Sequence, residues 1–300
     1  MTTQRRSLTT TGTSQEAFAI ADWGLLGGVA LIWGSSFLFM AVGLEAFEPG
    51  VVTLARVGLG SVALAVIPRS RRPIERADRS RVAVLGIIWI AIPLSLFPIA
   101  QQWIDSSVAG MINGAVPITG AIWAAMLLRR LPGRRQLLGI AIGFIGVVAI
   151  FLPELQDSSA TALGASLVAL AIVLYGLAAN MAVPLQQKYG ALPVLLRAQL
   201  WAMTLVVPIG LVQIPGSTWE WDAALAMIPL GVLGTGLAFV LMTTLVGRVG
   251  GTRGTVAIYF VPVVAVALGV IVRGEDIAPL ALVGTAMVLL GAWVTSRRED

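Results

Sequence analysis

The chain contains no cysteine and no histidine, and charged residues make up only 12% of its 300 residues. Without cysteine it can form neither a disulfide nor a thiolate metal site, and without histidine it lacks the commonest metal ligand and neutral-pH proton carrier. We therefore expect no catalytic residues, no metal ion and no cofactor. Ordinary globular domains carry about 25% charged residues, so most of this chain is expected to lie in lipid.

Apolar residues are abundant instead and make up 57% of the sequence. A run of about 20 such residues is long enough, at a rise of 1.5 Å per residue, to cross about 30 Å of hydrocarbon as a helix. The sequence therefore predicts an all-α integral membrane protein with ten transmembrane helices. The expected spans are 22–42, 50–68, 82–101, 107–128, 136–153, 163–184, 193–213, 223–246, 253–273 and 279–296.

The second half of the chain repeats the first at an offset of 145 residues. The matched pairs are Pro117 with Pro262, Gly139 with Gly284, and Gly146 with Gly291. Because each half contributes five spans, an odd number, the halves are predicted to cross the membrane in opposite directions, as in many transporters. We expect a disordered cytoplasmic tail at 1–20, one five-helix repeat at 21–153, an inverted repeat at 163–296, and a short cytoplasmic tail at 297–300.

Basic residues gather in the loops on one side of the expected spans, whereas Arg273 is the only one expected on the other side. Lysine and arginine stay on the cytoplasmic face during insertion, so we expect a multi-pass inner-membrane protein with both termini in the cytoplasm. The net charge of +5 then reflects topology rather than nucleic-acid binding. The expected partners are the lipid bilayer and a small-molecule solute; a monomer suffices, and a homodimer is left open.

Several segments carry a family resemblance: LIWGSSFLFM in the first span, PGVVTLARVGLG in the second, NGAVPITGAIWAA in the fourth and AIYFVPVVAVALG in the ninth. In this order and spacing, from about Gly24 to Trp293, the chain resembles the EamA-type members of the ten-helix drug/metabolite transporter superfamily. Such members usually carry a Gly-Glu pair in both halves. Here Gly274-Glu275 keeps the pair, while Arg129-Arg130 stands in the first half.

Polar and aromatic side chains within the spans are the candidate solute contacts. An unpaired amide or hydroxyl costs several kcal/mol in hydrocarbon, so such groups tend to face the bundle interior, although hydrogen bonds between helices are their commoner use. Tryptophans offer flat walls. The candidates for the substrate cavity are Trp33, Ser36, Arg56, Trp89, Gln101, Asn113, Tyr175, Asn180 and Tyr259.

Arg56 is the clearest intramembrane charge, roughly 9 Å from the expected external end of its span at helical rise. It would suit a substrate carboxylate, or its side chain could extend to the outer interface. Pro117 and Pro262 are expected to bend their helices around a central cavity, because proline removes a backbone donor and frees a carbonyl group; simple packing kinks are the alternative. We expect the first, third, fourth, sixth, eighth and ninth spans to line this cavity.

The spans lack acidic residues near the midplane, so the usual intramembrane proton relay is missing. The sequence therefore favours a facilitator or exchanger that works by alternating access, and the family resemblance implies export of amino acids or related metabolites. A multidrug exporter of aromatic cations is the main alternative: the tryptophans favour it, but no buried carboxylate would neutralise a cation. A non-transporting scaffold is the alternative of another class. An enzyme is disfavoured, because no nucleophile and base can be assembled.

Overall fold

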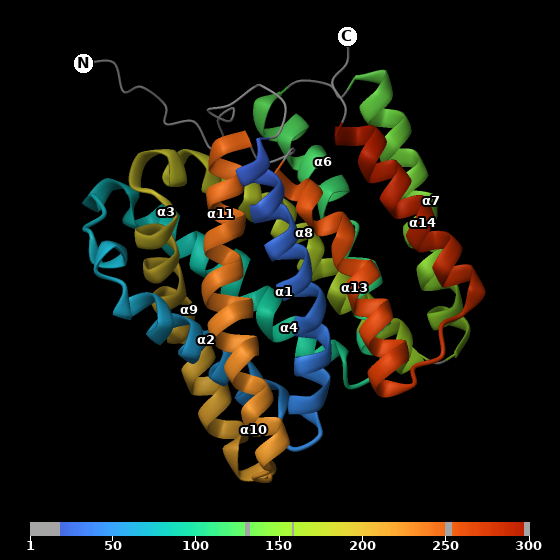
Figure 1. Cartoon of the computed structure of the whole chain (residues 1–300), viewed down its shortest axis with the longest axis horizontal. Coiled ribbons are helices and arrows are strands. Elements are labelled where there is room, and N and C mark those ends of the chain that lie inside the picture. The colour runs from blue at the N-terminus through green and yellow to red at the C-terminus, as the bar shows by residue number, and fades with distance from the viewer. Residues whose placement is uncertain (1–18, 130–132, 158, 250–253, 297–300) are drawn as a thin grey trace.

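The computed structural model describes residues 19–129, 133–157, 159–249 and 254–296. Within these ranges all regular elements are helical, and they form one bundle (Figure 1). Seven helical segments in the described chain are long and apolar enough to cross a membrane, and three shorter apolar helices cover 137–150, 257–273 and 279–291. The helical membrane fold is thus confirmed, while the count of ten spans stays a prediction. The expected tails, apart from residues 19 and 20, lie outside the described residues.

The first half contains two continuous helices followed by a span built from consecutive pieces, a broken span and another long helix. A 3-10 turn at Pro68–Arg71 and another at Arg76–Asp78 precede the third span. The helices are α1 (Ile20–Leu44), α2 (Pro49–Val66), α3 (Arg79–Leu85), η3 (Gly86–Ala91), α4 (Ile92–Ala100), α5 (Ser106–Asn113), α6 (Val116–Leu128) and α7 (Arg134–Asp157).

The second half has the same order of long and interrupted segments. Its elements are α8 (Ser159–Tyr189), α9 (Ala191–Gln213), η4 (Ile214–Gly216), α10 (Trp221–Ile228), η5 (Pro229–Leu237), α11 (Ala238–Val249), η6 (Thr255–Phe260), α13 (Val261–Leu268), η7 (Gly269–Arg273) and α14 (Pro279–Ser296). Three elements of the bundle, η3 in the first half and η5 and η7 in the second, are π-helical stretches.

Some helices run further than the expected spans. α8 continues through Pro184 to Tyr189, although the sixth span was expected to end at that proline, and α7 continues to Asp157. The stretch 154–162 between the expected repeats is therefore largely helical. The reason is that hydropathy marks where a helix leaves lipid, whereas backbone hydrogen bonding can continue beyond that boundary.

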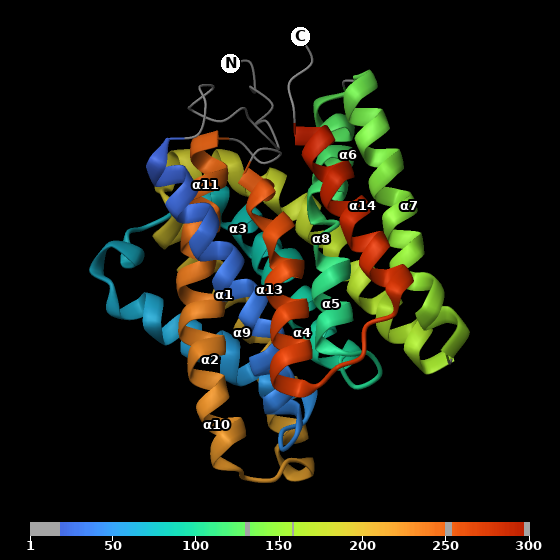
Figure 2. The ribbon, with the colours of Figure 1, turned by 45° about the vertical axis from the view of Figure 1, so that its right-hand side comes forward.

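The helices α7 and α14 lie side by side at one edge of the bundle in both views (Figures 1 and 2), and the start of α1 and the end of α14 lie at the same end. Glycines bring these two backbones together. A Cβ atom on Gly146 would lie 2.6 Å from the carbonyl oxygen of Gly284, and one on Gly291 would lie 2.5 Å from that of Gly139. These are the glycines that repeat at the 145-residue offset, and their pairing is reciprocal, as a two-fold relation between equivalent elements requires.

The two matched prolines occupy equivalent places at helix starts. Pro117 is the second residue of α6, and Pro262 is the second residue of α13, where a missing backbone donor does no harm. The interruptions therefore lie just before the prolines rather than as kinks within continuous helices. The break before α6 also lies against the start of α13, because a Cβ atom on Gly114 would lie 2.6 Å from Cγ of Pro262.

Candidate functional site

A small central cavity collects five of the nine candidate residues. Its volume is about 30 Å³, room for only one or two water molecules. The lining side chains come from α1, α2, α4, α5 and α8. They are Trp33, Ser36, Phe37, Met40, Arg56, Phe97, Asn113 and Tyr175.

The Arg56 guanidinium points into the protein and is only 3% exposed. Its Nε donates a hydrogen bond to Oγ1 of Thr235 at 3.2 Å, and Nη1 lies 3.6 Å from Sδ of Met40. Within the described ranges no carboxylate lies at ion-pair distance from it. A buried charge without a partner of opposite sign is costly, so the site is built to hold an anion or loses stability by keeping this residue.

Close packing of α2 on the π-helical stretch η5 places Thr235 beside Arg56. A Cβ atom on Gly231 would lie 3.0 Å from the carbonyl oxygen of Arg56, and one on Gly60 would lie 3.0 Å from Cβ of Thr235. Glycine at both positions lets the two backbones approach. Stretches of π-helix occur often at functional sites, and here one supplies the hydroxyl that holds the guanidinium.

Aromatic side chains form the walls of the cavity. The rings of Phe37 and Phe97 lie 5.5 Å apart in an edge-to-face arrangement, and Phe97 lies 5.9 Å from Tyr175. The Trp33 indole is fixed by a 2.9 Å hydrogen bond from Nε1 to the carbonyl oxygen of Gly234. The lining residues thus combine one cation, the hydroxyls of Ser36 and Tyr175 and one amide with flat apolar surfaces.

The other four candidates lie outside this lining. Trp89 is buried 5.5 Å from the ring of Phe239, which also packs on Trp33, so it stands behind the cavity wall. Asn180 donates to backbone carbonyl oxygens on α6 and α8, both at 2.9 Å, and therefore joins these helices. Tyr259 is buried on η6, and Gln101 lines the second cavity described below.

The helices around the cavity differ from those expected. The second span was not among those expected to line the cavity, yet it contributes the candidate Arg56, whereas the eighth and ninth spans contribute no lining residue. The eighth span acts through Thr235 instead. The prediction was wrong here because proline and polar content mark breaks and contacts but do not say which face of a helix turns inward.

Sequence reasoning missed three apolar residues that line the cavity: Phe37, Met40 and Phe97. Two of them could have been found. Trp33, Phe37 and Met40 follow the spacing that places residues on one face of a helix, so Trp33 points to its neighbours. Phe97 carries no comparable signal, because apolar residues of its kind occur throughout the spans.

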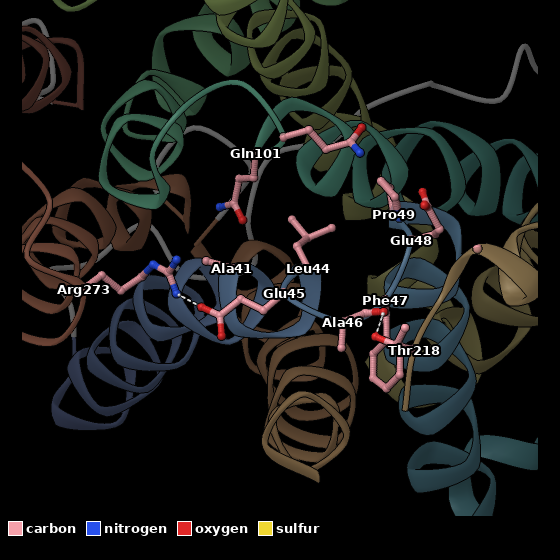
Figure 3. A pocket seen from close by; sticks show the side chains of 12 residues that line it. Ala41, Leu44, Glu45, Ala46, Phe47, Glu48, Pro49, Gln101, Thr218 and Arg273 are labelled. Atoms are coloured by element: carbon pink, nitrogen blue, oxygen red, sulfur yellow. Dashed lines mark hydrogen bonds and ion pairs between the residues drawn. The ribbon is translucent and has the colours of Figure 1, made fainter. Parts of the chain in front are cut away.

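A larger cavity, which we call the vestibule, lies beyond the central cavity along α1 and α4 (Figure 3). It measures about 520 Å³. Along α1 the central lining ends at Met40 and the vestibule begins at Ala41; along α4 the same change occurs between Phe97 and Gln101. The vestibule is lined by Ala41, Leu44, Glu45, Ala46, Phe47, Glu48, Pro49, Gln101, Gln102, Gly216, Thr218 and Arg273.

Polar groups face this vestibule. Nη1 of Arg273 forms an ion pair with Oε1 of Glu45 at 2.6 Å across one wall (Figure 3). The amide nitrogen and oxygen of Gln101 have no hydrogen-bond partner in the described chain. Gln101 stands between the lining of the central cavity and that of the vestibule.

At the same end of the bundle as the vestibule, one carboxylate caps the start of a helix. Oε1 of Glu275 accepts hydrogen bonds from the amide of Ser106 at 3.2 Å and from its hydroxyl at 2.5 Å, and Oε2 accepts one from the amide of Ser107 at 2.9 Å. These amides begin α5, where unpaired N–H groups favour a negative charge. Glu275 therefore joins the end of the ninth span to the start of the fourth.

At the opposite end of the bundle, ion pairs also join the two halves. Oδ1 of Asp22 lies 2.7 Å from Nε of Arg248. Oδ2 of Asp78 lies 2.9 Å from Nζ of Lys188 and accepts a hydrogen bond from the Tyr189 hydroxyl at 2.6 Å. Both aspartates are only 2% exposed, whereas the side chains of Arg248 and Lys188 are 44% and 41% exposed. This end, where the basic loops lie, is called the basic end below.

Comparison with known proteins gives a consistent picture. The sequence model of the EamA-like transporter family matches residues 23–152 and 162–297. A probable terminal-alkyne amino-acid exporter of Streptantibioticus cattleyicolor is 28% identical over 93% of this chain and 94% of its own length. The uncharacterized transporter YoaV of Bacillus subtilis is 23% identical, with 89% of this chain and 94% of the relative covered.

Two further matches concern location and fold. The uncharacterized inner membrane transporter YedA of Escherichia coli is 24% identical over 89% of this chain and 88% of its own length. A crystal structure with 17% sequence identity superposes with a TM-score of 0.64 and covers 92% of this chain and 97% of the other. These findings support a multi-pass membrane protein with the transporter fold.

Proposed function

The chain belongs to the EamA-like transporter family, and on that premise we propose that it exports amino acids or closely related small metabolites across the inner membrane by alternating access. The name of the Streptantibioticus cattleyicolor relative, a probable amino-acid exporter, supports this substrate class. Transport is a facilitated or exchange process, because the spans offer no acidic proton relay. Both termini and the basic end face the cytoplasm, following the distribution of lysine and arginine.

The observation that carries the proposal is the unpaired Arg56 guanidinium at the central cavity. A solute carboxylate supplies the missing negative charge and forms a two-point contact with the planar guanidinium. The Ser36 hydroxyl and the Asn113 amide oxygen line the same cavity and accept hydrogen bonds from the solute's ammonium group. Phe37 and Phe97 receive an apolar side chain.

The two cavities suggest which step of the cycle this conformation represents. The vestibule is about 520 Å³ and the central cavity only about 30 Å³, so the path is widened on the side away from the basic end while the binding site has collapsed. This is the arrangement expected after release to the outside. Loading from the cytoplasm then requires Asp22 and Arg248 to separate, with the breaks before Pro117 and Pro262 taking up the backbone change.

Counterflow in sealed liposomes tests the proposal. Purified protein is reconstituted with an unlabelled amino acid inside, and uptake of a panel of labelled amino acids is measured. We expect saturable uptake that falls at least tenfold in Arg56→Gln and in Asn113→Leu, since each removes a lining polar group. Arg56→Lys keeps the charge but not the planar fork, so partial activity is expected. Arg72→Gln, an exposed arginine outside both cavities, is the matched control.

Each variant is first checked for folding by gel filtration and thermal unfolding in detergent. A folded Arg56→Gln protein with unchanged uptake would contradict the role of Arg56. Uptake of aromatic cations without any amino-acid counterflow would instead favour the multidrug exporter, for which the aromatic walls are the supporting observation. Absence of flux for every solute class would favour the non-transporting scaffold.

A further inference from the structure

A third cavity, of about 230 Å³, lies at the basic end, between the loop that precedes α3 and the first turns of α9. We propose that it binds the phosphate of an anionic phospholipid from the adjacent membrane leaflet. The proposal does not depend on which solute is transported. The cavity is lined by Pro73, Ile74, Arg79, Val82, Arg197 and Trp201.

The two arginines give the cavity a positive charge that the protein does not neutralise. Nε of Arg79 donates to the carbonyl oxygen of Ile74 at 3.4 Å, and Nη2 of Arg197 donates to that of Arg71 at 3.1 Å. Within the described ranges neither takes part in an ion pair. Each guanidinium carries five N–H groups, so most of them remain for a phosphate oxygen.

Other cations at the same end are used differently. Arg248 and Lys188 lie 2.7 Å and 2.9 Å from buried aspartate oxygens, so their charge is already balanced. The exposed Arg72 and Arg76 lie on the loop beside the cavity and add to the local positive potential. An anionic membrane surface is attracted to such clusters, and basic pockets between helices at this level bind lipid headgroups.

The remaining wall of the cavity indicates a lipid rather than a soluble phosphate. Trp201 is 47% exposed, and the exposed side chains of Leu205 and Ile209 continue along the same helix, away from the basic loops. Tryptophan favours the boundary between headgroups and hydrocarbon. A phospholipid can place its phosphate between Arg79 and Arg197 and its acyl chains along this strip, whereas inorganic phosphate would use only the arginines.

Helix packing fixes the tryptophan in this position. A Cβ atom on Gly86 would lie 3.0 Å from Cβ of Trp201, so η3 and α9 are in close contact beside the cavity. Arg79 on α3 and Arg197 and Trp201 on α9 therefore come from helices that pack together, and Pro73 and Ile74 complete the lining from the loop before α3.

Native mass spectrometry of the delipidated protein tests the proposal. Phosphatidylglycerol or phosphatidylcholine is added, and the fraction of protein retaining one lipid is measured at rising concentration. We expect a preference for phosphatidylglycerol that weakens at least about tenfold in Arg79→Gln/Arg197→Gln. The control Arg72→Gln/Arg76→Gln makes the same change in net charge outside the cavity and is expected to weaken the preference much less than the cavity pair does.

Two further arms distinguish the sources of phosphate and guard against misfolding. Inorganic phosphate and glycerol phosphate are added as competitors, and we expect them to displace the lipid only weakly. Trp201→Ala tests the apolar wall, and we expect this variant to retain less lipid. Arg79→Lys and Arg197→Lys are also measured singly, in case gel filtration shows that the double variant is misfolded. We expect each single variant to lower the preference for phosphatidylglycerol, but less than the double variant does. Equal loss in the control pair, no loss in any cavity variant, or full displacement by inorganic phosphate would overturn the lipid assignment.

Discussion

The two ends of the bundle come from a repeated sequence but are held together by different chemistry. Around the vestibule, Glu275 caps the start of α5 through three hydrogen bonds, and Arg273 pairs with Glu45 in partial contact with solvent. At the basic end, Asp22 and Asp78 are almost fully buried when they bind cations of the other half. The acidic partner is therefore buried at the basic end but 55% exposed in the pair of Glu45 with Arg273, while the basic partners at both ends are partly exposed.

The two halves of the repeat differ at the position of this cap. The residue that matches Glu275 at the 145-residue offset is Arg130, which lies outside the described residues. An arginine has no acceptor and cannot cap a helix start as a carboxylate does. The same position in the two halves therefore carries opposite charge, so the closure at one end cannot be copied at the other.

The largest expected effect concerns the sidedness of the two ends. Because the chain has no cysteine, a single introduced cysteine can be labelled without background. In intact cells, we expect a membrane-impermeant maleimide to label Gln102→Cys in the vestibule and to leave Arg72→Cys unlabelled until the membrane is opened. Labelling of Arg72→Cys alone in intact cells would reverse the proposed orientation.

At the basic end, Asp78→Ala should cost about 2 kcal/mol of unfolding free energy, because it removes the buried carboxylate that accepts a hydrogen bond from the Tyr189 hydroxyl; Lys188 keeps Glu75 as a partner. Thermal unfolding in detergent measures this loss. Glu75 is the matched control: it binds the same Lys188 at 2.7 Å, but its side chain is 58% exposed, so Glu75→Ala should cost less than about 0.5 kcal/mol. Equal losses would refute the distinction between buried and exposed contacts.

At the vestibule end, Glu275→Ala should cost about 1 kcal/mol, in the range measured for loss of a helix cap. The same thermal assay applies. Asp276→Ala changes the exposed neighbour, which makes none of these cap hydrogen bonds, and is expected to leave stability within about 0.5 kcal/mol of the original. If the two variants behave alike, the cap does not stabilise the vestibule end.

The smallest effect is a pH dependence at Asp105, the residue before α5. Burial, and next to it the charge of Glu275, raise the pKa of Asp105 above its ordinary value of 3.8. The folded protein therefore binds this proton more tightly than the unfolded chain, so the resulting stability is complete below the ordinary pKa and is lost as pH rises through the raised one. We expect the stability of the original protein relative to Asp105→Asn to fall over that interval, as measured by thermal unfolding at several pH values. A constant difference would contradict this.

Much of the fold was predictable because hydropathy is a local property of the sequence, and apolar runs mark helices in lipid wherever they pack. Five candidates, including Arg56 and Asn113, meet at one cavity because polar groups in lipid turn inward. The same signal cannot separate Asn113 from Asn180, since an inward amide can face a cavity or join two helices. Whether the cavity residues contact solute stays a prediction.

The role of Glu275 was hidden for a different reason. Its partners at Ser106 and Ser107 are far away in the sequence and belong to the other half. The sequence indicated an acidic outer loop, but only the folded chain shows which helix start that loop reaches. The helices that line the cavity were mispredicted on similar grounds, because proline positions do not define the orientation of a helix about its axis.

The contact between Gly114 and Pro262 has a consequence for how such a protein can evolve. Duplication normally frees each copy to accept changes independently. Here Pro262 of the second copy occupies the space where any larger side chain at position 114 of the first would lie. A chimera that joins one half of this chain to the other half of a distant relative is therefore expected to assemble only when a small residue at position 114 faces the proline of the other half. Substitutions at these two positions are thus not independent of each other.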